Sequence, residues 1–399
     1  MAERVGNLGY AAFSTETNPG TPSVTPSVFT LLDNETMTTM YNLEDQTPIA
    51  GMPIETFQVL PGLRSHKGDI EIVAEPNTAL EVVDALLTRG TSSGAGPYTW
   101  PFTLPASASP LPKSKTLDIS TGNVVKRFVG VQASKITPVI KKNQINLKVS
   151  LSALGSFQGA VLAAAPTGTG PYTVAFDTTY DTNPTSKLVV GDLIRFYHST
   201  GTVIDAVIAS IVDASHITTT TNVTTMAQGD IMYLRPASPS FSLLTPFLWS
   251  NTQFCFGTTA AAALSAAQTR LEPGSTWEVD YSFESDDGSQ RSGSADPASL
   301  IRMTGKSALN IKKFFDTPED VINFNQQNKT ACVVRHYAYS GGQTYELRVT
   351  LNNMKTEDPL PKIKSKGVNY SDIKYHTQYD QADGQEFDIK VIAGSSTIA

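Results

Sequence analysis

The sequence contains few cysteines. Only Cys255 and Cys332 occur in 399 residues, and their spacing fits neither a zinc site nor a CxxC redox motif. Both lie in apolar stretches, QFCFG and ACVVR, where buried free thiols are the ordinary outcome. We therefore expect neither a disulfide framework nor a metal site.

Long apolar runs are also missing. No window approaches the ~20 apolar residues that a membrane-spanning helix requires, and the N-terminus lacks the apolar core of a signal peptide. The sequence thus predicts a chain that is made and folded in a cytoplasm and does not insert into a membrane.

Charge is scarce and on balance acidic. Charged residues make up 17% of the chain and the net charge is −7, whereas roughly a quarter of the residues of an ordinary protein are charged. A general nucleic-acid binder carries a basic stripe, and here the basic clusters are short and lie beside predicted strands: Lys141-Lys142, Lys312-Lys313 and 362–366. The 28 glycines and 24 prolines favour a β-rich protein with many turns.

Two short motifs resemble catalytic or nucleotide-binding loops only in part. Residues 302–308, RMTGKSA, end like a phosphate-binding loop, but Leu300 stands where that loop needs its first glycine, and no parallel βαβ unit surrounds it. Ser292-Gly293-Ser294, near Asp296, lacks the flanking glycines of a nucleophile elbow and lies in a polar loop. Neither motif predicts a site.

The titratable residues do not form a catalytic group either. The acidic pairs Asp286-Asp287 and Glu319-Asp320 suit a solvated loop and the first turn of a helix. The histidines are scattered, with no pair at metal-ligand spacing on one element: His66, His198, His216, His336 and His376. We therefore expect a protein that is not an enzyme, with no catalytic, cofactor-binding or metal-binding residues.

The most organised stretch is GDIEIVAEPNTALEVVDALL, residues 68–87. Its first part alternates as a half-buried strand does. Pro76 then breaks the extended run, and Asn77 or Thr78 caps a helix, with Thr78 and Glu81 at capping-box spacing. Gly90 ends this helix. One helical face is apolar: Leu80, Val83, Leu86 and Leu87.

A second stretch, residues 307–327, has the same order of strand, turn and capped helix. Asp316 or Thr317 caps the helix, and Pro318 occupies its first position. Its buried side is expected to be apolar: Val321, Ile322 and Phe324. The recurrence predicts a chain that contains one unit twice.

The intervening patterns divide the chain into four parts. Residues 1–27 form a turn-rich N-terminal arm without a core of its own, 28–165 a first repeat, 166–238 an inserted small β domain, and 239–399 a second repeat with the C-terminal segment. The inserted part has short β runs at the spacing of a small barrel or sandwich. Within the repeats, 44–67 reads as a long polar loop and 285–304 as a polar excursion. The clearest strand alternates strictly: Ile145, Leu147, Val149 and Leu151.

Several of these stretches resemble the tail tube, or major tail, proteins of long-tailed bacteriophages. They are the opening 9–42, the segment KGDIEIVAEPNTALEVVDALL, the ribbon FVGVQASKITPVIKKNQINLKVSLSALGS, and in the second half the strand 277–283 with the 305–327 module. The resemblance covers most of residues 9–160 and 248–395. Residues 166–238 resemble the extra outer domains that some of these proteins carry.

The resemblance implies a mainly β fold, in which each repeat is a β-sandwich or barrel with a flanking helix. Six repeats make one ring, so a duplicated chain implies a homotrimer with pseudo-sixfold symmetry. Rings stack into the tube of the virion tail, together with tape-measure and tail terminator or initiator proteins. Viral DNA passes through the lumen without specific binding, and an acidic lumen suits that passage. The polar excursions and the N-terminal arm are then expected to become ordered on the adjacent ring, and the helices to brace the outside of the wall.

Two other classes of function stay open. The first is a phage or cell-surface adhesin or receptor-binding protein that uses the inserted domain, with tyrosines as candidate contacts: Tyr172, Tyr180 and Tyr197. The second is a hydrolase on a β fold, which the missing catalytic pattern disfavours. Tubes or stacked rings would distinguish the tail-tube reading from both of these.

Overall fold

The computed structural model describes residues 9–23, 28–46, 58–104, 112–179, 181–242, 244–281, 296–297, 299–300, 305–314, 319–326, 328–356, 370–382 and 384–398. It is mainly β, with 54% strand and 9% helix, and contains a closed six-strand barrel. The predicted β-rich class is therefore confirmed.

The barrel is built from the first half of the chain. Its strands pair antiparallel in a closed ring whose last member, β7, returns to β1. In ring order they are β1 (Tyr10–Thr15), β2 (Val28–Glu35), β4 (Gln58–Val73), β9 (Gln144–Ala153), β8 (Val125–Lys141) and β7 (Lys115–Ser120). The predicted alternation of β9 is confirmed, because Ile145, Leu147, Val149 and Leu151 all point into the core. Apolar side chains at every second position are what closes this sheet around its interior.

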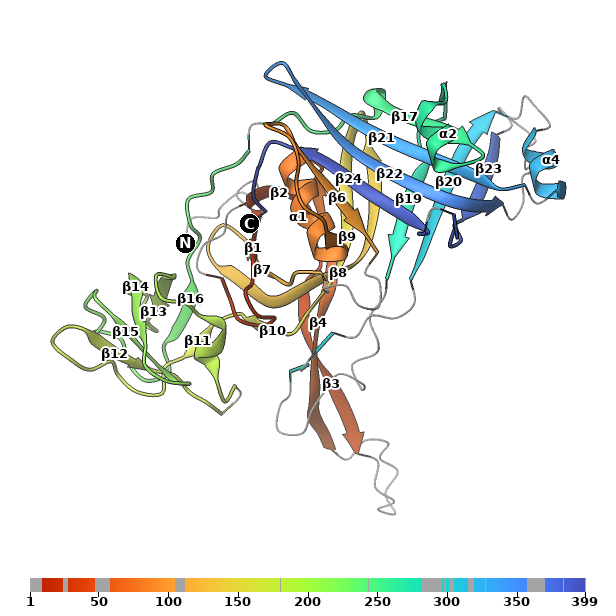
Figure 1. Ribbon diagram of the computed structural model, residues 1–399. Helices are drawn as coiled ribbons and strands as arrows, with labels where there is room; N and C mark the ends of the chain where they lie inside the picture. The colour runs from red at the N-terminus through yellow and green to blue at the C-terminus, as the bar shows by residue number, and fades with distance from the viewer. Residues whose placement is uncertain are drawn as a thin grey trace, which may run out of the picture.

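A long hairpin arm projects from the barrel (Figure 1). Strand β3 (Thr38–Gln46) pairs with the first half of β4, from Thr38 opposite Lys67 to Gln46 opposite Gln58. The prediction that 44–67 is a loop is therefore wrong for 44–46 and 58–67. Pro61 is accommodated because it lies where the register of the ladder shifts, and a proline is tolerated at such an irregularity. Residues 47–57 lie outside the described part.

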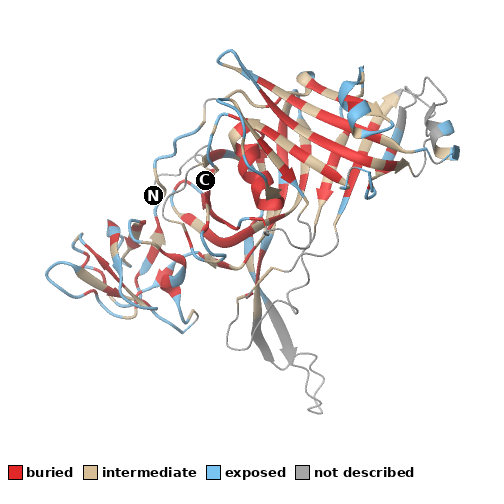
Figure 2. Cartoon of the chain, viewed as in Figure 1, coloured by how far each residue is buried: buried red, intermediate tan, exposed pale blue. Residues whose placement is uncertain are grey.

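Helix α1 (Pro76–Leu86) follows β4, as the sequence predicts, but its cap differs from the prediction. Its N-cap is Glu75, without a side-chain cap hydrogen bond, and Thr78 lies buried inside the helix. The helix packs between the barrel strands β8 and β2 and strands of the second half, β22 and β24. Ten of its eleven residues are buried, and the helix is accordingly red in Figure 2.

Three charges are buried where α1 meets the barrel. Lys115 Nζ lies 2.7 Å from Glu81 Oε2 and 2.8 Å from Asp84 Oδ2, and it donates to Thr15 Oγ1 over 2.6 Å. The three charged side chains are 0–1% exposed. The carboxylate expected in a capping box thus pairs across the core instead, and it fixes the helix to β1 and β7.

The second half forms a pair of sheets that share one strand. The apolar positions of both pack into the same core as the barrel. The described strands of this half are β17 (Thr252–Gly257), β18 (Gln268–Thr269), β19 (Thr276–Asp280), β20 (Lys306–Phe314), β21 (Thr330–Ser340), β22 (Gln343–Thr356), β23 (Tyr370–His376) and β24 (Phe387–Ala393). Strand β6 (Tyr98–Thr103), with the short β5 (Thr88–Arg89) beside it, joins the free side of β24.

Two of the described helices accompany these sheets. Helix α2 (Ala260–Ser265) covers β17 and β21, and α4 (Glu319–Gln326) occupies the predicted second helix. Ile322 was expected on the buried side of α4, and in the single chain it is 45% exposed. The expected capping residues 316–318 lie outside the described part.

The strand pairings of the two halves follow one pattern. Strands β2 and β3 pair with successive parts of β4 and together take the place of β19, so the order β2/β3–β4–β9–β8 has its counterpart in β19–β20–β23–β22. Likewise, β1–β7–β8 corresponds to β17–β21–β22, and β8–β10 to β22–β24. The pairing of β1 with β2, which closes the barrel, has no counterpart among the described strands of the second half.

A small unit with its own hydrophobic core is attached to the barrel (Figure 1). Its strands are β11 (Ala160–Val161), β12 (Tyr172–Ala175), β13 (Leu193–Tyr197), β14 (Val203–Ile211), β15 (His216–Thr219) and β16 (Ile231–Leu234). They pair in the order β11–β16–β13–β14–β15–β12, and a bridge from Leu162 to Phe176 joins the two ends. The core also includes Phe157, Ala160 and Leu162, which precede residue 166. Strand β10 (Gly155–Phe157) and the short 3-10 helix η2 (Pro184–Lys187) connect the unit to β8.

Replacing Lys115 by Met should lower the free energy of unfolding by about 3–5 kcal/mol, because Glu81 and Asp84 lose the buried cation between them. Asp84 then keeps the longer contact with Arg89, at 3.6 Å. Urea denaturation of the purified chain measures this value. Lys148→Met is the matched control, because Lys148 pairs with Asp69 at 2.9 Å but is 52% exposed, and an exposed pair contributes less than about 1 kcal/mol. Equal losses in the two variants would contradict a buried ion cluster.

His336 should make the chain sensitive to acid. Trp277 Nε1 donates to its Nε2 over 2.9 Å, and Thr252 Oγ1 lies 2.9 Å from its Nδ1. Burial lowers the pKa of His336 to about 3 from the ordinary 6.5. Between these pKa values the unfolded chain binds a proton that the folded chain does not. The free energy of unfolding should therefore decrease as the pH is lowered, by about 1.4 kcal/mol per pH unit.

The measurement is urea denaturation between pH 7 and pH 4. The wild type should lose stability more steeply than His336→Gln by that amount, whereas His216→Gln, at an exposed histidine, should follow the wild type. Parallel curves for wild type and His336→Gln would show that the buried imidazole is not the cause.

Candidate functional site: the cleft at the base of the arm

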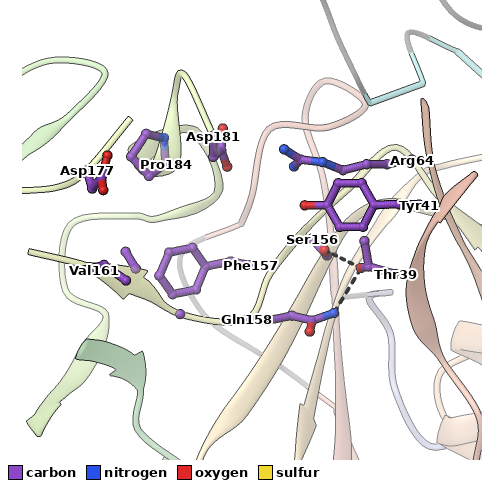
Figure 3. Close-up of a pocket in the computed structure, with 12 residues that line it drawn as sticks. Thr39, Tyr41, Arg64, Ser156, Phe157, Gln158, Val161, Asp177, Asp181 and Pro184 are labelled. Atoms are coloured by element: carbon purple, nitrogen blue, oxygen red, sulfur yellow. Dashed lines mark hydrogen bonds between the residues drawn. The ribbon is translucent and has the colours of Figure 1, made fainter. Parts of the chain in front are cut away.

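A cleft of about 260 Å³ lies where the arm, the barrel and the small unit meet. Figure 3 shows its walls: Thr39 and Tyr41 from β3 and Arg64 from β4 on one side, and Asp177, Asp181 and Pro184 of the small unit on the other. Ser156, Phe157 and Gln158 lie between them. Three parts of the chain that are distant in sequence therefore share this one site.

The hydroxyl of Thr39 is surrounded by polar partners. It lies 2.9 Å from His66 Nδ1 and 2.6 Å from Ser156 Oγ, and it accepts a hydrogen bond from Gln158 Nε2 over 2.9 Å. A hydroxyl has one proton to donate and two lone pairs. These contacts therefore use most of its hydrogen-bonding capacity and tie the arm to β10.

Asp296 joins the same network from a segment that is remote in sequence. His66 Nε2 lies 3.2 Å from its Oδ1, Arg64 Nη1 3.3 Å from the same oxygen, and Lys187 Nζ 3.5 Å from its Oδ2. Burial raises the pKa of Asp296, but the hydrogen bond with His66 and the charges of Lys187 and Arg64 outweigh it, so the pKa lies below its ordinary value. The carboxylate thus stays charged and holds β4 and η2 together.

Thr39, His66 and Asp296 form a hydroxyl–imidazole–carboxylate series of the kind that hydrolases use. Two features favour a structural role here. The hydroxyl is already engaged by Ser156 and Gln158, and the carboxylate is shared with Arg64 and Lys187 rather than reserved for the imidazole. A catalytic hydroxyl needs its lone pair free to attack.

A second ionic contact fixes the small unit to the barrel. The buried guanidinium of Arg127, on β8, donates to Asp118 Oδ1 and Oδ2 over 2.8 and 2.9 Å and to Asp192 Oδ2 and Oδ1 over 2.6 and 3.0 Å. Asp192 belongs to the small unit and also accepts from the Val189 N–H. Because both contacts are bidentate, they set orientation as well as distance.

The partial motifs of the sequence have structural places. Lys306 and Ser307 begin strand β20, and Ser307 Oγ donates to Glu386 Oε1 over 2.6 Å, so these two residues of the motif belong to a sheet. Residues 301–304 lie outside the described part. Residues 286–287 and 292–294 lie outside the described part. Glu319 and Asp320 open α4.

The histidines and tyrosines are dispersed. His198 contacts Asp230 and His216 contacts Asp213 within the small unit, and His376 lies in β23. Tyr172 and Tyr197 are half-buried, and Tyr180 is not among the described residues. Within the described ranges, no group of three or more His, Cys, Asp and Glu side chains is placed to hold a metal ion.

No protein-family model matches the chain, and no curated protein matches it. Among the residues that the structure describes, no helix has the length and apolar character needed to span a membrane.

Replacing Asp296 by Asn should loosen the junction between arm and small unit, because one charge that three basic groups share is lost. Hydrogen exchange at neutral pH should become faster in the peptides that contain residues 64–66 and 184–192. Asp205→Asn is the control, since Asp205 pairs with Arg195 on the neighbouring strand within the small unit. Unchanged exchange in both peptides would show that Asp296 does not join them.

Proposed function

We propose that this chain is a structural subunit of a bacteriophage tail tube, which polymerises into stacked rings that conduct the genome into the host. The observation that carries this proposal is the recurrence of one pairing pattern in both halves of the chain. A protein of two equivalent units builds a pseudo-sixfold ring from three copies, whereas one unit per chain would need six.

The recurrence extends to details of register, which supports duplication of the whole unit rather than a chance similarity. The β7–β8 ladder shifts register between Lys115 and Leu117, and the β21–β22 ladder shifts between Thr330 and Cys332. Just past the shift, β8 changes partner from β7 to β9, and β22 changes from β21 to β23. In each half a helix follows the equivalent strand, α1 after β4 and α4 after β20.

One sheet runs through both units, as the wall of a tube requires. Its strands are β2, β4, β9, β8, β19, β20, β23 and β22, in that order. One face of this sheet packs on the core through residues such as Ile70, Val149 and Leu309. We assign the opposite, polar face to the lumen.

Ion pairs occupy that polar face. Lys141 contacts Asp33 and Glu71, Lys148 contacts Asp69, and Lys135 contacts both acids of β19, Glu278 and Asp280. Lysines that are held by carboxylates have little attraction left for phosphate. Such a face suits DNA that slides without being bound, although its charges are mixed rather than purely acidic.

The parts outside the wall have assignments in the same proposal. The outer part of the β3–β4 arm and the excursion 285–304 contact the adjacent ring, and the small unit decorates the exterior. The N-terminal arm 1–27 was expected to do the same, but its residues 10–15 form strand β1 of the barrel, so the prediction of an arm without a core of its own is wrong for them. Tape-measure and terminator or initiator proteins set the length and ends of the tube in the virion. Helix α1, which was expected outside the wall, is buried within the chain, because strands of the second half cover it.

Electron cryomicroscopy of the purified protein tests this function. We expect tubes or stacked rings in which three copies make one ring with pseudo-sixfold density. Rings of six copies would contradict the duplication. Discrete particles that bind glycans and never form rings would favour an adhesin and overturn the proposal.

A further inference from the structure

The two units inside one chain meet where two strands pair. Strand β19 of the second unit pairs with β8 of the first, with Val279 opposite Ile136 and Asp280 opposite Lys135. Lys135 Nζ reinforces the contact at 2.9 Å from Glu278 Oε2. Above this junction, α1 of the first unit is covered by β24, β22 and β6, which belong to or extend the second unit's sheet. A strand edge and a helix face are thus buried together.

The first unit has an edge equivalent to β19, at the beginning of β3. Thr38 lies opposite Lys67 of β4, as Glu278 lies opposite Ala308 of β20. The preceding residues, Met37 and Trp277, are both fully buried. Among the described strands, β3 pairs with β4 alone. Just after Thr38, the side chains of Met40 and Tyr41 are 47% and 46% exposed.

The second unit has a helix face equivalent to that of α1. Pro76 begins α1, and Pro318 immediately precedes the described α4 in the sequence. Counting from these prolines, Ile322 takes the place of Leu80. Leu80 is 1% exposed and Ile322 is 45% exposed. The chain therefore covers the first of these positions and leaves the second open.

We propose that a second copy of this chain repeats the junction, with its β3 edge, Thr38–Tyr41, docking beside the second unit of the first copy and its barrel covering the Ile322 face of α4. This proposal rests on the proposed duplication. It accounts for both exposed features with one kind of contact, because at the internal junction a strand edge of one unit and a helix face of the other are buried together. The contact is heterologous, since each copy gives its first unit to one neighbour and its second unit to the other.

The two kinds of junction differ in chemistry. Glu278 and Asp280, which pair with Lys135 inside the chain, correspond to Thr38 and Met40 at the free edge. The contact between copies is therefore uncharged at these positions and depends on backbone pairing and apolar burial. The Lys135 position of β8 can then distinguish a β19 edge from a β3 edge, because only β19 carries the carboxylates that satisfy its charge.

Thiol labelling tests the proposal, because both native cysteines are buried, at 3% and 0% exposed. Met40→Cys, Ile322→Cys and the control Val203→Cys each place one thiol at a position of 45–47% exposure. Val203 lies on β14 of the small unit, away from the junction. In the unassembled chain all three should react with a maleimide at similar rates.

In assembled rings, the thiols at 40 and 322 should react at least about tenfold more slowly, while the thiol at 203 keeps its rate. Chains labelled beforehand at 40 or 322 should fail to enter rings with wild-type protein, and chains labelled at 203 should enter. Rings whose thiols at 40 and 322 react as in the free chain would overturn this inference and leave the tube function standing. Wild-type protein that forms no rings would overturn both.

Discussion

Strand β8 is the constraint on which the rest of the structure depends. Its first half pairs with β7, β10 and the end of β16, and its second half pairs with β9 and β19. One strand thus closes the barrel, carries the small unit and joins the second half of the chain. A sheet edge presents unpaired N–H and C=O groups that must be covered, and β8 has partners on both sides along much of its length. Arg127, near its start, adds a buried charge that the carboxylates of Asp118 and Asp192 neutralise.

The elements that could be predicted from the sequence are those whose cause is local. The alternation of β9 and the strand–helix order of 68–87 each depend on neighbouring residues, and both are present in the structure. The arm was mistaken for a loop because its prolines argue against a strand, and nothing local reveals that Pro61 lies at a shift of register. The cap of α1 was misassigned for a related reason, since Glu81 has a better partner in Lys115, 34 residues away.

The cleft at the base of the arm was beyond prediction from one sequence. His66 and Asp296 are separated by 230 residues, and neither lies in a recognisable motif. The only signal for the cleft was the carboxylate of Asp296 in a polar segment, and the need to keep such a segment soluble accounts for that carboxylate equally well. The predicted burial of Ile322 in α4 was wrong for another reason. A period of 3.6 residues indicates that a helix face will be covered, but not whether the same chain covers it.

The two ends of the small unit lie side by side, and this affects how the chain can gain or lose domains in evolution. Its first and last strands are hydrogen-bonded neighbours, with Ala160 opposite Met232 and Val161 opposite Ile231. The chain therefore leaves the barrel and returns to it at nearly the same point, about 5 Å apart. An insert with adjoining ends can be gained, exchanged or removed while the surrounding strands keep their register. The segment between Gly155 and Leu234 is thus a suitable place to insert a foreign domain.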